Sequence, residues 1–279
     1  MEFTTKVDIG KSRALISHEQ KILLLGSCFS DNIGEKLVDA GFDATVNPLG
    51  TLYNPASIKE AICPSDWDEF VKWLHSRVNG QQSTVNSQRS TSGEEELKNS
   101  KPQKLKTSDY DTLIITFGTA WVFRLKETGM IVANCRKQPD CLFRRERLSV
   151  DDIVDMWVSL LEKELSGTKV IFTVSPIRHK KDGFHGNQLS KSTLLLAIDR
   201  LIEKFPEKCE YFPAYEILMD ELRDYRFYAD DMLHPSQVAV NYIWQLFQDK
   251  YFSESTKQKV LEEEKKRKAE RHVANIVRS

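Results

Sequence analysis

The stretch "LLLGSCFSDNIG" at residues 23–34 places two candidate nucleophiles, Ser27 and Cys28, directly after an apolar run. A helix-like segment follows, so we expect both residues where a strand passes into a helix. A thiol at a helix N-terminus lies near unpaired backbone N–H groups, which favour its thiolate and lower its pKa. A serine hydroxyl at this place would need a separate base. The sequence favours Cys28 as the nucleophile and keeps Ser27 as the second candidate. It also leaves open that both residues only cap and pack the helix.

A candidate base lies near the other end of the chain, in the motif "DDMLHP" at residues 230–235. On a turn, the carboxylate of Asp231 can hold one ring nitrogen of His234 and leave the other nitrogen free to face a nucleophile. Asp230 is a neighbouring acid that could take the same part. The alternative is an acid that caps the following helix beside a histidine that only packs there.

These residues must be brought together by the elements that carry them. Short apolar runs alternate with helix-like segments along the chain, which is typical of a parallel sheet covered on both faces. The predicted strands are 21–26, 43–47, 111–118, 169–176 and 209–215. The predicted helices are 31–41, 55–62, 66–76, 149–166, 187–204 and 235–250, the fourth capped by Ser149. The sequence therefore predicts an α/β three-layer sandwich with a central parallel sheet of about five strands.

Ligands of such sheets bind beyond the carboxyl ends of the strands, where further polar clusters follow the predicted strands. They read "NPLGTLYNP", "GTAWVF" and "SPIRHKKDGFHGN". The last cluster and the segment "NCRKQP" hold side chains that could bind a carboxylate or a phosphate. These side chains are Arg136, Lys137, Arg178, His179, His185 and Asn187. For each of them, a place on a basic surface loop is the ordinary alternative.

The motifs also carry a resemblance to known proteins. "LLLGSCFSDNIG" and "DDMLHP" resemble the first and last sequence blocks of the SGNH (GDSL-like) hydrolases. More closely, the chain resembles the GSCFA family of bacterial proteins over about residues 1–252, because "GSCFSDNIG", "NPLGTLYNP", "TFGTAWVF", "VANC", "SPIRH" and "DMLHPS" follow in that family's order. The resemblance implies a flavodoxin-like fold of the SGNH type. It aligns Cys28 with the nucleophilic serine of those hydrolases and Ser27 with their aspartate.

An acyl-transfer site also needs donors for an oxyanion. The resemblance implies the backbone N–H groups of Cys28 and of a glycine after the second strand, which we assign to Gly50. The SGNH pattern adds an asparagine in a Gly-x-Asn-Asp block, but residues 118–121 read Gly-Thr-Ala-Trp here. Candidates for the missing donor are Asn47, Asn54 and Asn134. Candidates for substrate contacts are Asn54, Gly118, Trp121, Asn134, Lys137, Arg178 and His179. Gly118 could equally be a turn residue and Trp121 part of the core.

Composition restricts the partners. The sequence has 40 Lys and Arg against 41 Asp and Glu, so nothing indicates a nucleic-acid partner. No apolar stretch reaches membrane-span length and no secretion signal is visible, so we expect a cytoplasmic protein that does not enter a membrane. Five scattered cysteines suit reduced thiols and form no zinc pattern. We expect no metal and no cofactor.

Two segments depart from the α/β order. Residues 79–108 are polar, which predicts a mobile insertion, and residues 253–279 alternate acids and bases at helical spacing, which predicts a charged C-terminal helix. Residues 1–252 then form a single SGNH-like domain.

Together these features predict an SGNH-like hydrolase, either an acyl esterase or an acyltransferase. It would act through a covalent acyl-enzyme on a small or carbohydrate-linked ester, with Cys28 attacking, His234 moving the proton and Asp231 orienting the imidazole. The alternative is a catalytically inactive SGNH-fold protein that binds a glycan or an acylated ligand.

Overall fold

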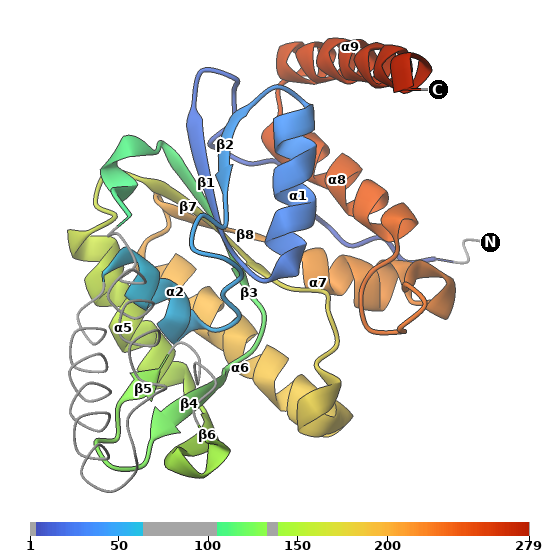
Figure 1. Ribbon diagram of the computed structural model, residues 1–279. Helices are drawn as coiled ribbons and strands as arrows, with labels where there is room; N and C mark the ends of the chain where they lie inside the picture. The colour runs from blue at the N-terminus through green and yellow to red at the C-terminus, as the bar shows by residue number, and fades with distance from the viewer. Residues whose placement is uncertain (1–3, 64–104, 133–138, 279) are drawn as a thin grey trace, which may run out of the picture.

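The protein is built around a central sheet of five parallel strands (Figure 1). The structure is a computed structural model that describes residues 4–63, 105–132 and 139–278. The strands are β1 (Lys21–Gly26), β2 (Asp43–Val46), β3 (Thr112–Phe117), β7 (Lys169–Val174) and β8 (Cys209–Phe212). Their order across the sheet is β2-β1-β3-β7-β8, the order of a flavodoxin-like fold. Each strand overlaps a predicted one, so the predicted α/β class and its parallel sheet are confirmed.

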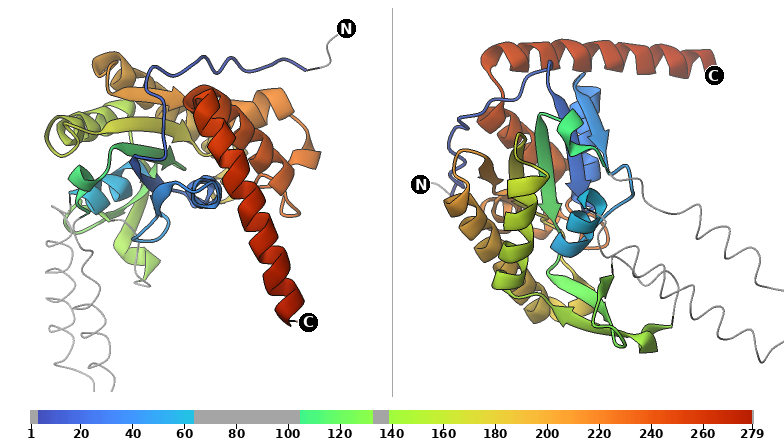
Figure 2. Two further views of the ribbon diagram at one scale, coloured as in Figure 1. Left: turned by 90° about the horizontal axis from the view of Figure 1, so that it is seen from above. Right: turned by 90° about the vertical axis from the view of Figure 1, so that its left-hand side faces the viewer.

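Apolar side chains of the strands alternate between two helical layers. In β1, Ile22 and Leu24 pack into one apolar cluster, and Leu23 and Leu25 pack into the other. The helices of the first layer are α1 (Cys28–Asp39), α7 (Ala214–Glu216) and α8 (Gln237–Tyr251). Those of the second layer are α2 (Pro55–Ile62), α5 (Val150–Lys163) and α6 (Gly183–Lys204). Both faces of the sheet are thus covered, and Figure 2 shows helices on either side of it.

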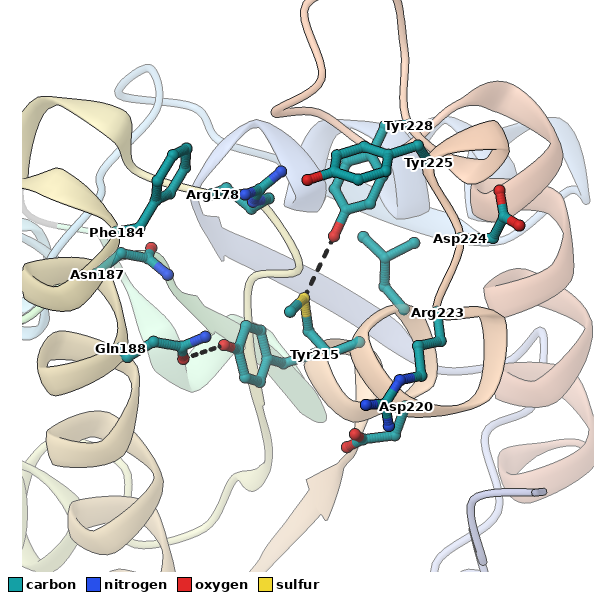
Figure 3. Close-up of a pocket in the computed structure, with 12 residues that line it drawn as sticks. Arg178, Phe184, Asn187, Gln188, Tyr215, Asp220, Arg223, Asp224, Tyr225 and Tyr228 are labelled. Carbon is teal, nitrogen blue, oxygen red and sulfur yellow. Dashed lines mark hydrogen bonds between the residues drawn. The ribbon is translucent and has the colours of Figure 1, made fainter. Parts of the chain in front are cut away.

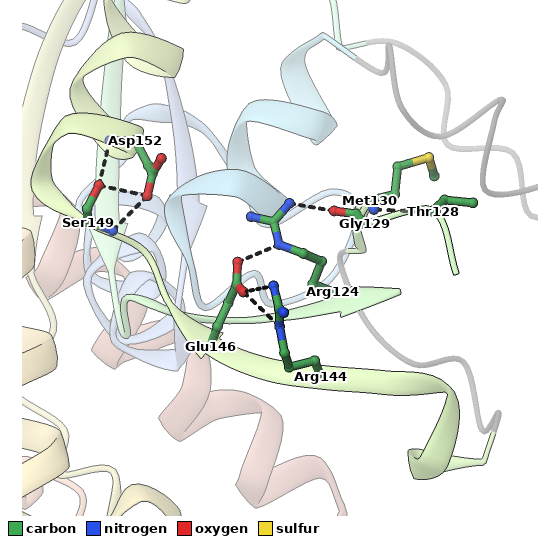
Figure 4. A network of polar contacts seen from close by, with 8 residues as sticks. All are labelled: Arg124, Thr128, Gly129, Met130, Arg144, Glu146, Ser149 and Asp152. Atoms are coloured by element: carbon green, nitrogen blue, oxygen red, sulfur yellow. Dashed lines mark hydrogen bonds and ion pairs between the residues drawn. The ribbon is translucent and has the colours of Figure 1, made fainter. Parts of the chain in front are cut away.

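Three short strands form a second, antiparallel sheet that the sequence did not predict. They are β4 (Trp121–Leu125), β5 (Ile131–Val132) and β6 (Phe143–Arg147), in the order β5-β4-β6. Arg124 Nε donates to the Glu146 carboxylate at 2.5 Å, and Arg144 pairs with the same carboxylate at 2.7 Å (Figure 4). Strand β6 reads FRRER, with four charged residues out of five. It therefore lacks the apolar run from which the strands of the central sheet are predicted.

The predicted helices exist wherever the structure describes their residues, although two begin earlier than predicted. Helix α1 begins at Cys28 rather than at residue 31, and α6 begins at Gly183 rather than at residue 187. The predicted cap of α5 is confirmed, because the Ser149 hydroxyl accepts from the Asp152 N–H at 3.0 Å. The Asp152 carboxylate in turn accepts from the Ser149 N–H at 2.9 Å. This reciprocal pair is a capping box.

Some predicted segments lie outside the described residues. They are the helix at 66–76 and the polar insertion at 79–108, except for its last four residues, 105–108. The charged stretch at 253–279 forms helix α9 (Glu254–Arg278). In Figure 1, α9 lies at the opposite end of the molecule from the small antiparallel sheet. Among the helices of the described part of the chain, none combines the length and apolar character needed to cross a membrane.

Candidate functional site

The junction between β1 and α1 separates the two candidate nucleophiles. Gly26 has φ +151°, and a Cβ atom there would lie 2.3 Å from the Thr116 carbonyl oxygen, so only glycine allows β1 and β3 to approach this closely. Ser27 is fully buried, and its hydroxyl accepts from the Phe29 N–H at 3.4 Å as the cap of α1. Cys28 is half-buried and lines a cavity. The thiol is therefore the one of the two groups that reaches a space for a ligand.

The turn before α8 holds His234 by way of Asp231. Asp231 Oδ2 lies 2.5 Å from His234 Nδ1, and Oδ1 accepts from the backbone N–H groups of Leu233 and His234, each at 2.9 Å. These backbone donors, followed by the bond to the imidazole, lower the pKa of Asp231 to about 2. The carboxylate is therefore ionised under all ordinary conditions. It fixes the orientation of the ring through Nδ1 and leaves Nε2 for another partner.

Cys28 and His234 line the same cavity of about 540 Å³, although they come from opposite ends of the sequence. The candidate substrate-binding residues that also line it are Asn54, Trp121, Arg178 and His179. Thr119 and Ile177, near the ends of β3 and β7, are also among the lining residues. The carboxyl edge of the sheet thus brings together the first and last motifs, as the topology requires.

The two oxyanion donors predicted after β2, Gly50 and Asn47, do not lie at the cavity of Cys28 and His234. The Gly50 N–H donates to the Asn47 carbonyl at 2.8 Å. The Asn47 side chain accepts from the Gly26 N–H at 2.9 Å and donates to Asp31 at 2.7 Å. Both residues already have partners inside the protein and neither lines the cavity. The structure therefore uses them to brace the loop against the β1–α1 junction.

Asn54 differs from Asn47 in that its side-chain NH₂ group is not used in a hydrogen bond to the described residues. Its Oδ1 caps α2 by accepting from the Ser57 N–H at 2.8 Å. Among the described residues, no acceptor is found for Asn54 Nδ2, and the residue lines the cavity with Cys28. Of the three asparagines considered, Asn54 thus has a side-chain donor to offer. Asn134 lies outside the described residues, as do Arg136 and Lys137.

A fully buried lysine, Lys191 of α6, lies beneath the site and was missed by the sequence analysis. Its Nζ donates to the carbonyl oxygens of Gly118 and Ser175, each at 2.7 Å. Burial lowers the pKa of Lys191 to about 7, and the nearby Cys28 sulfur acts in the opposite direction. A signal was present in the sequence, because Lys191 stands three residues before Leu194 and seven before Ile198 on the apolar stripe of α6.

The prediction that the helix N-terminus lowers the pKa of Cys28 is wrong. Burial raises the pKa of this thiol, and the Asp31 carboxylate in the first turn of α1 raises it further. The N–H groups of Cys28 and Phe29 and the charge of Lys191 oppose this shift without cancelling it. The Cys28 side chain is therefore a neutral thiol near pH 7, which would need a base in order to act as a nucleophile.

His179 forms a second wall of the cavity rather than part of a basic surface loop. Its backbone N–H donates to Asn187 Oδ1 at 2.9 Å, so the Asn187 side chain stabilises the loop that carries His179. Its Nε2 is buried near Gly118, and no hydrogen-bond partner is found for it within the described ranges. Burial, followed by the charge of Lys191, lowers the pKa of His179 to about 4, so the ring is neutral near pH 7. His179 can therefore donate or accept a hydrogen bond there without carrying a charge.

Two further predicted substrate contacts, Gly118 and Trp121, have partners within the protein. The N–H of Gly118 donates to the Tyr53 carbonyl at 2.9 Å and its carbonyl accepts from Lys191, so Gly118 belongs to the frame of the site. Trp121 lies against Arg145, whose guanidinium carbon is 5.8 Å from the indole ring. Among the described residues, no group of three His, Cys, Asp or Glu side chains could hold a metal ion.

Comparison with known proteins gives one family and several distant structural neighbours. The sequence model of the GSCFA family matches residues 21–247. No curated protein matches the chain. The structure is similar to the acetylxylan esterase Axe2 from Geobacillus stearothermophilus, with 11% identity, a TM-score of 0.48 and coverage of 86% of this chain and 97% of the other.

Two other structures overlap to a similar extent. An α/β hydrolase, LAE5, from the metagenome of Lake Arreo in Spain has 8% identity, a TM-score of 0.47 and coverage of 85% of this chain and 96% of its own. A putative acylhydrolase from Bacteroides fragilis has 13% identity, a TM-score of 0.42 and coverage of 91% and 92%. Similarities at this level assign no activity to the present chain.

Proposed function

The chain belongs to the GSCFA family, and we propose that it cleaves acyl esters through an acyl-thioester formed on Cys28. The observation that carries this proposal is that Cys28 and His234 line one cavity while Asp231 holds the imidazole by Nδ1. A nucleophile, a base and a group that orients the base are the parts that acyl transfer requires.

In the proposed first step, His234 Nε2 takes the thiol proton as the Cys28 sulfur attacks the ester carbonyl. A C–S bond forms and the carbonyl becomes a tetrahedral oxyanion. When this intermediate collapses, the C–O bond to the alcohol breaks and the imidazolium gives its proton to the departing oxygen. The raised pKa of Cys28 fits this sequence, because a neutral thiol must lose its proton during the attack.

In the proposed second step, the thioester is resolved. Water, or a second alcohol in the same place, loses its proton to His234 and attacks the thioester carbonyl. The C–S bond then breaks and the Cys28 sulfur takes the proton back from the imidazolium, which completes hydrolysis with water and acyl transfer with an alcohol. The oxyanion of either step would accept from the Cys28 N–H and from Asn54 Nδ2. Lys191 adds positive charge below the sulfur while it is protonated.

The test is to trap the acyl-enzyme. Wild-type protein mixed with 4-nitrophenyl acetate should carry an acetyl group on the peptide that contains Cys28, detected by mass spectrometry. Cys28→Ala should abolish the modification and the release of nitrophenol, and Ser27→Ala should retain both. Cys141→Ala, which removes an exposed free cysteine, is the matched control. Turnover by Cys28→Ala would contradict the proposal, and a wild type that is never acylated would favour the ligand-binding alternative.

A further inference from the structure

A second cavity, of about 470 Å³, borders the first at Arg178, which lines both. It lies between the start of α6 and the π-helical turn η4 (Ile217–Leu222) with the segment after it. Four aromatic rings line it, namely Phe184, Tyr215, Tyr225 and Tyr228. Figure 3 shows Arg178 between Phe184 on one side and Tyr225 and Tyr228 on the other. The proposed catalytic mechanism uses none of these rings.

The aromatic rings are held in place and remain partly open to solvent. The guanidinium carbon of Arg178 lies 4.4 Å from the ring centre of Phe184 and 5.7 Å from that of Tyr225. Arg178 is itself fixed, because its Nη1 donates to the Met232 carbonyl at 3.2 Å. Phe184 is nevertheless 50% exposed and Tyr225 63% exposed. Large apolar rings that are fixed by neighbours and left exposed provide a ready surface for a ligand.

The charges of this second cavity balance one another. Arg178 and Arg223 are set against Asp220 and Asp224 among the lining residues. An anionic ligand would meet the two carboxylates, and a lipid chain would have to desolvate four charged groups. The lining also offers Gln188, whose Oε1 accepts from the Tyr215 hydroxyl at 2.7 Å; no acceptor is found for its amide N–H groups in the part of the chain that the structure describes. These groups suit a neutral ligand that carries many hydroxyls.

We propose that the second cavity binds a sugar ring of the ester's alcohol part, so that the substrate is an acylated carbohydrate. A sugar ring has a face of C–H bonds, which packs on rings such as Tyr225, and a rim of hydroxyls, which bond to Gln188 and the carboxylates. The shared Arg178 places this ring beside the cavity of Cys28 and His234. The substrate assignment rests on the proposed function, whereas the binding of a sugar does not.

The first experiment measures binding alone. Wild-type protein is titrated in a calorimeter with neutral trisaccharides of xylose, glucose, mannose and N-acetylglucosamine, none of them acylated. At least one should bind, and Tyr225→Ala should weaken its binding about tenfold, which corresponds to about 1.4 kcal/mol for the lost ring contact. Leu196→Ala removes an exposed apolar side chain of α6 elsewhere and should bind like wild type. Tyr225→Phe should retain most of the affinity.

No binding of any trisaccharide by the wild type would overturn the proposal, as would equal binding by Tyr225→Ala. The second experiment compares kcat/KM for an acetylated form of the bound sugar with kcat/KM for 4-nitrophenyl acetate. This ratio should fall about tenfold in Tyr225→Ala and should not change in Leu196→Ala. Sugar binding without cleavage of any ester would defeat the proposed function and leave the sugar site standing. Ester cleavage without sugar binding would do the reverse.

Discussion

The Nζ atom of Lys191 lies 2.7 Å from the carbonyl oxygen of Gly118, which follows β3. The same atom lies 2.7 Å from the carbonyl oxygen of Ser175, which follows β7. A buried lysine thus joins the carboxyl ends of two neighbouring strands, close enough to Cys28 to influence the pKa of its thiol. A neutral amine has two N–H groups, which match these two acceptors, whereas an ammonium group has a third proton and a charge to bury.

The first prediction is that Lys191 makes the stability of the protein depend on pH. Its pKa is about 7 in the folded protein and about 10.4 in an unfolded chain. Between these values the unfolded chain holds the extra proton, so the contribution of Lys191 to stability rises with pH and is smallest below about pH 7. Urea unfolding from pH 6 to 9 should therefore show wild type gaining stability relative to Lys191→Met. Lys163→Met, at an exposed position on α5, should follow the wild-type profile. Parallel profiles for wild type and Lys191→Met would contradict the prediction.

The second prediction concerns the thiol of Cys28. Because burial raises its pKa, the rate of alkylation by iodoacetamide, followed on the Cys28 peptide, should have a midpoint above the ordinary value of about 8.5. Lys191→Met should move the midpoint upward, since a nearby positive charge is lost. Asp31→Asn should move it downward, since a nearby negative charge is lost. A wild-type midpoint below 8.5 would instead indicate a preformed thiolate.

The third prediction is that Asp231 acts by orienting His234 and not by taking up a proton. With a pKa of about 2, it should contribute no step to the pH–rate profile between pH 4 and 9. Asp231→Asn should lower kcat for 4-nitrophenyl acetate by about two to four orders of magnitude, with a small effect on KM. Asp230→Asn removes the neighbouring acid and is the control, which we expect to stay within about twofold of wild type. An equal loss in both variants would contradict this assignment.

The fourth prediction is that Gly26 cannot carry a side chain. An added Cβ atom would lie 2.3 Å from the Thr116 carbonyl oxygen and 2.9 Å from the Ser30 hydroxyl, so β1 and β3 would have to separate. Gly26→Ala should lower the free energy of unfolding by about 3 kcal/mol or more, measured in urea. Gly167→Ala is the control, because a Cβ atom there meets nothing within 4 Å. A Gly26→Ala variant as stable as that control would show that the junction can relax.

Much of the frame could be predicted from the sequence, because parallel strands buried on both faces read as short apolar runs. The segments "KILLLG" and "KVIFTV" became β1 and β7 within a residue or two of the predicted limits. The strands β4 to β6 could not be found in this way. Strand β6 reads FRRER and β5 has only two residues, so neither shows an apolar run, and the pairing of Arg124 with Glu146 between β4 and β6 is not visible as a periodicity.

The site was predictable where a motif fixes local geometry, as in the turn that joins Asp231 to His234. It was less predictable where a property depends on several elements at once. The pKa of Cys28 follows from burial by surrounding segments, and this outweighs the helix terminus on which the sequence argument depended. Whether Asn47 has a free side-chain donor likewise depends on Asp31, which lies on α1 and accepts from Asn47 Nδ2.

The positions of Cys28 and His234 near opposite ends of the chain also bear on the order in which the protein is made. The cavity that they share requires β1, β3 and β7 to be assembled and the turn before α8 to be in place. Contacts between such distant segments form late, because closing the long intervening loops costs entropy. In a nascent chain Cys28 is therefore made well before His234, and a chain that ends before residue 234 has the thiol without the imidazole.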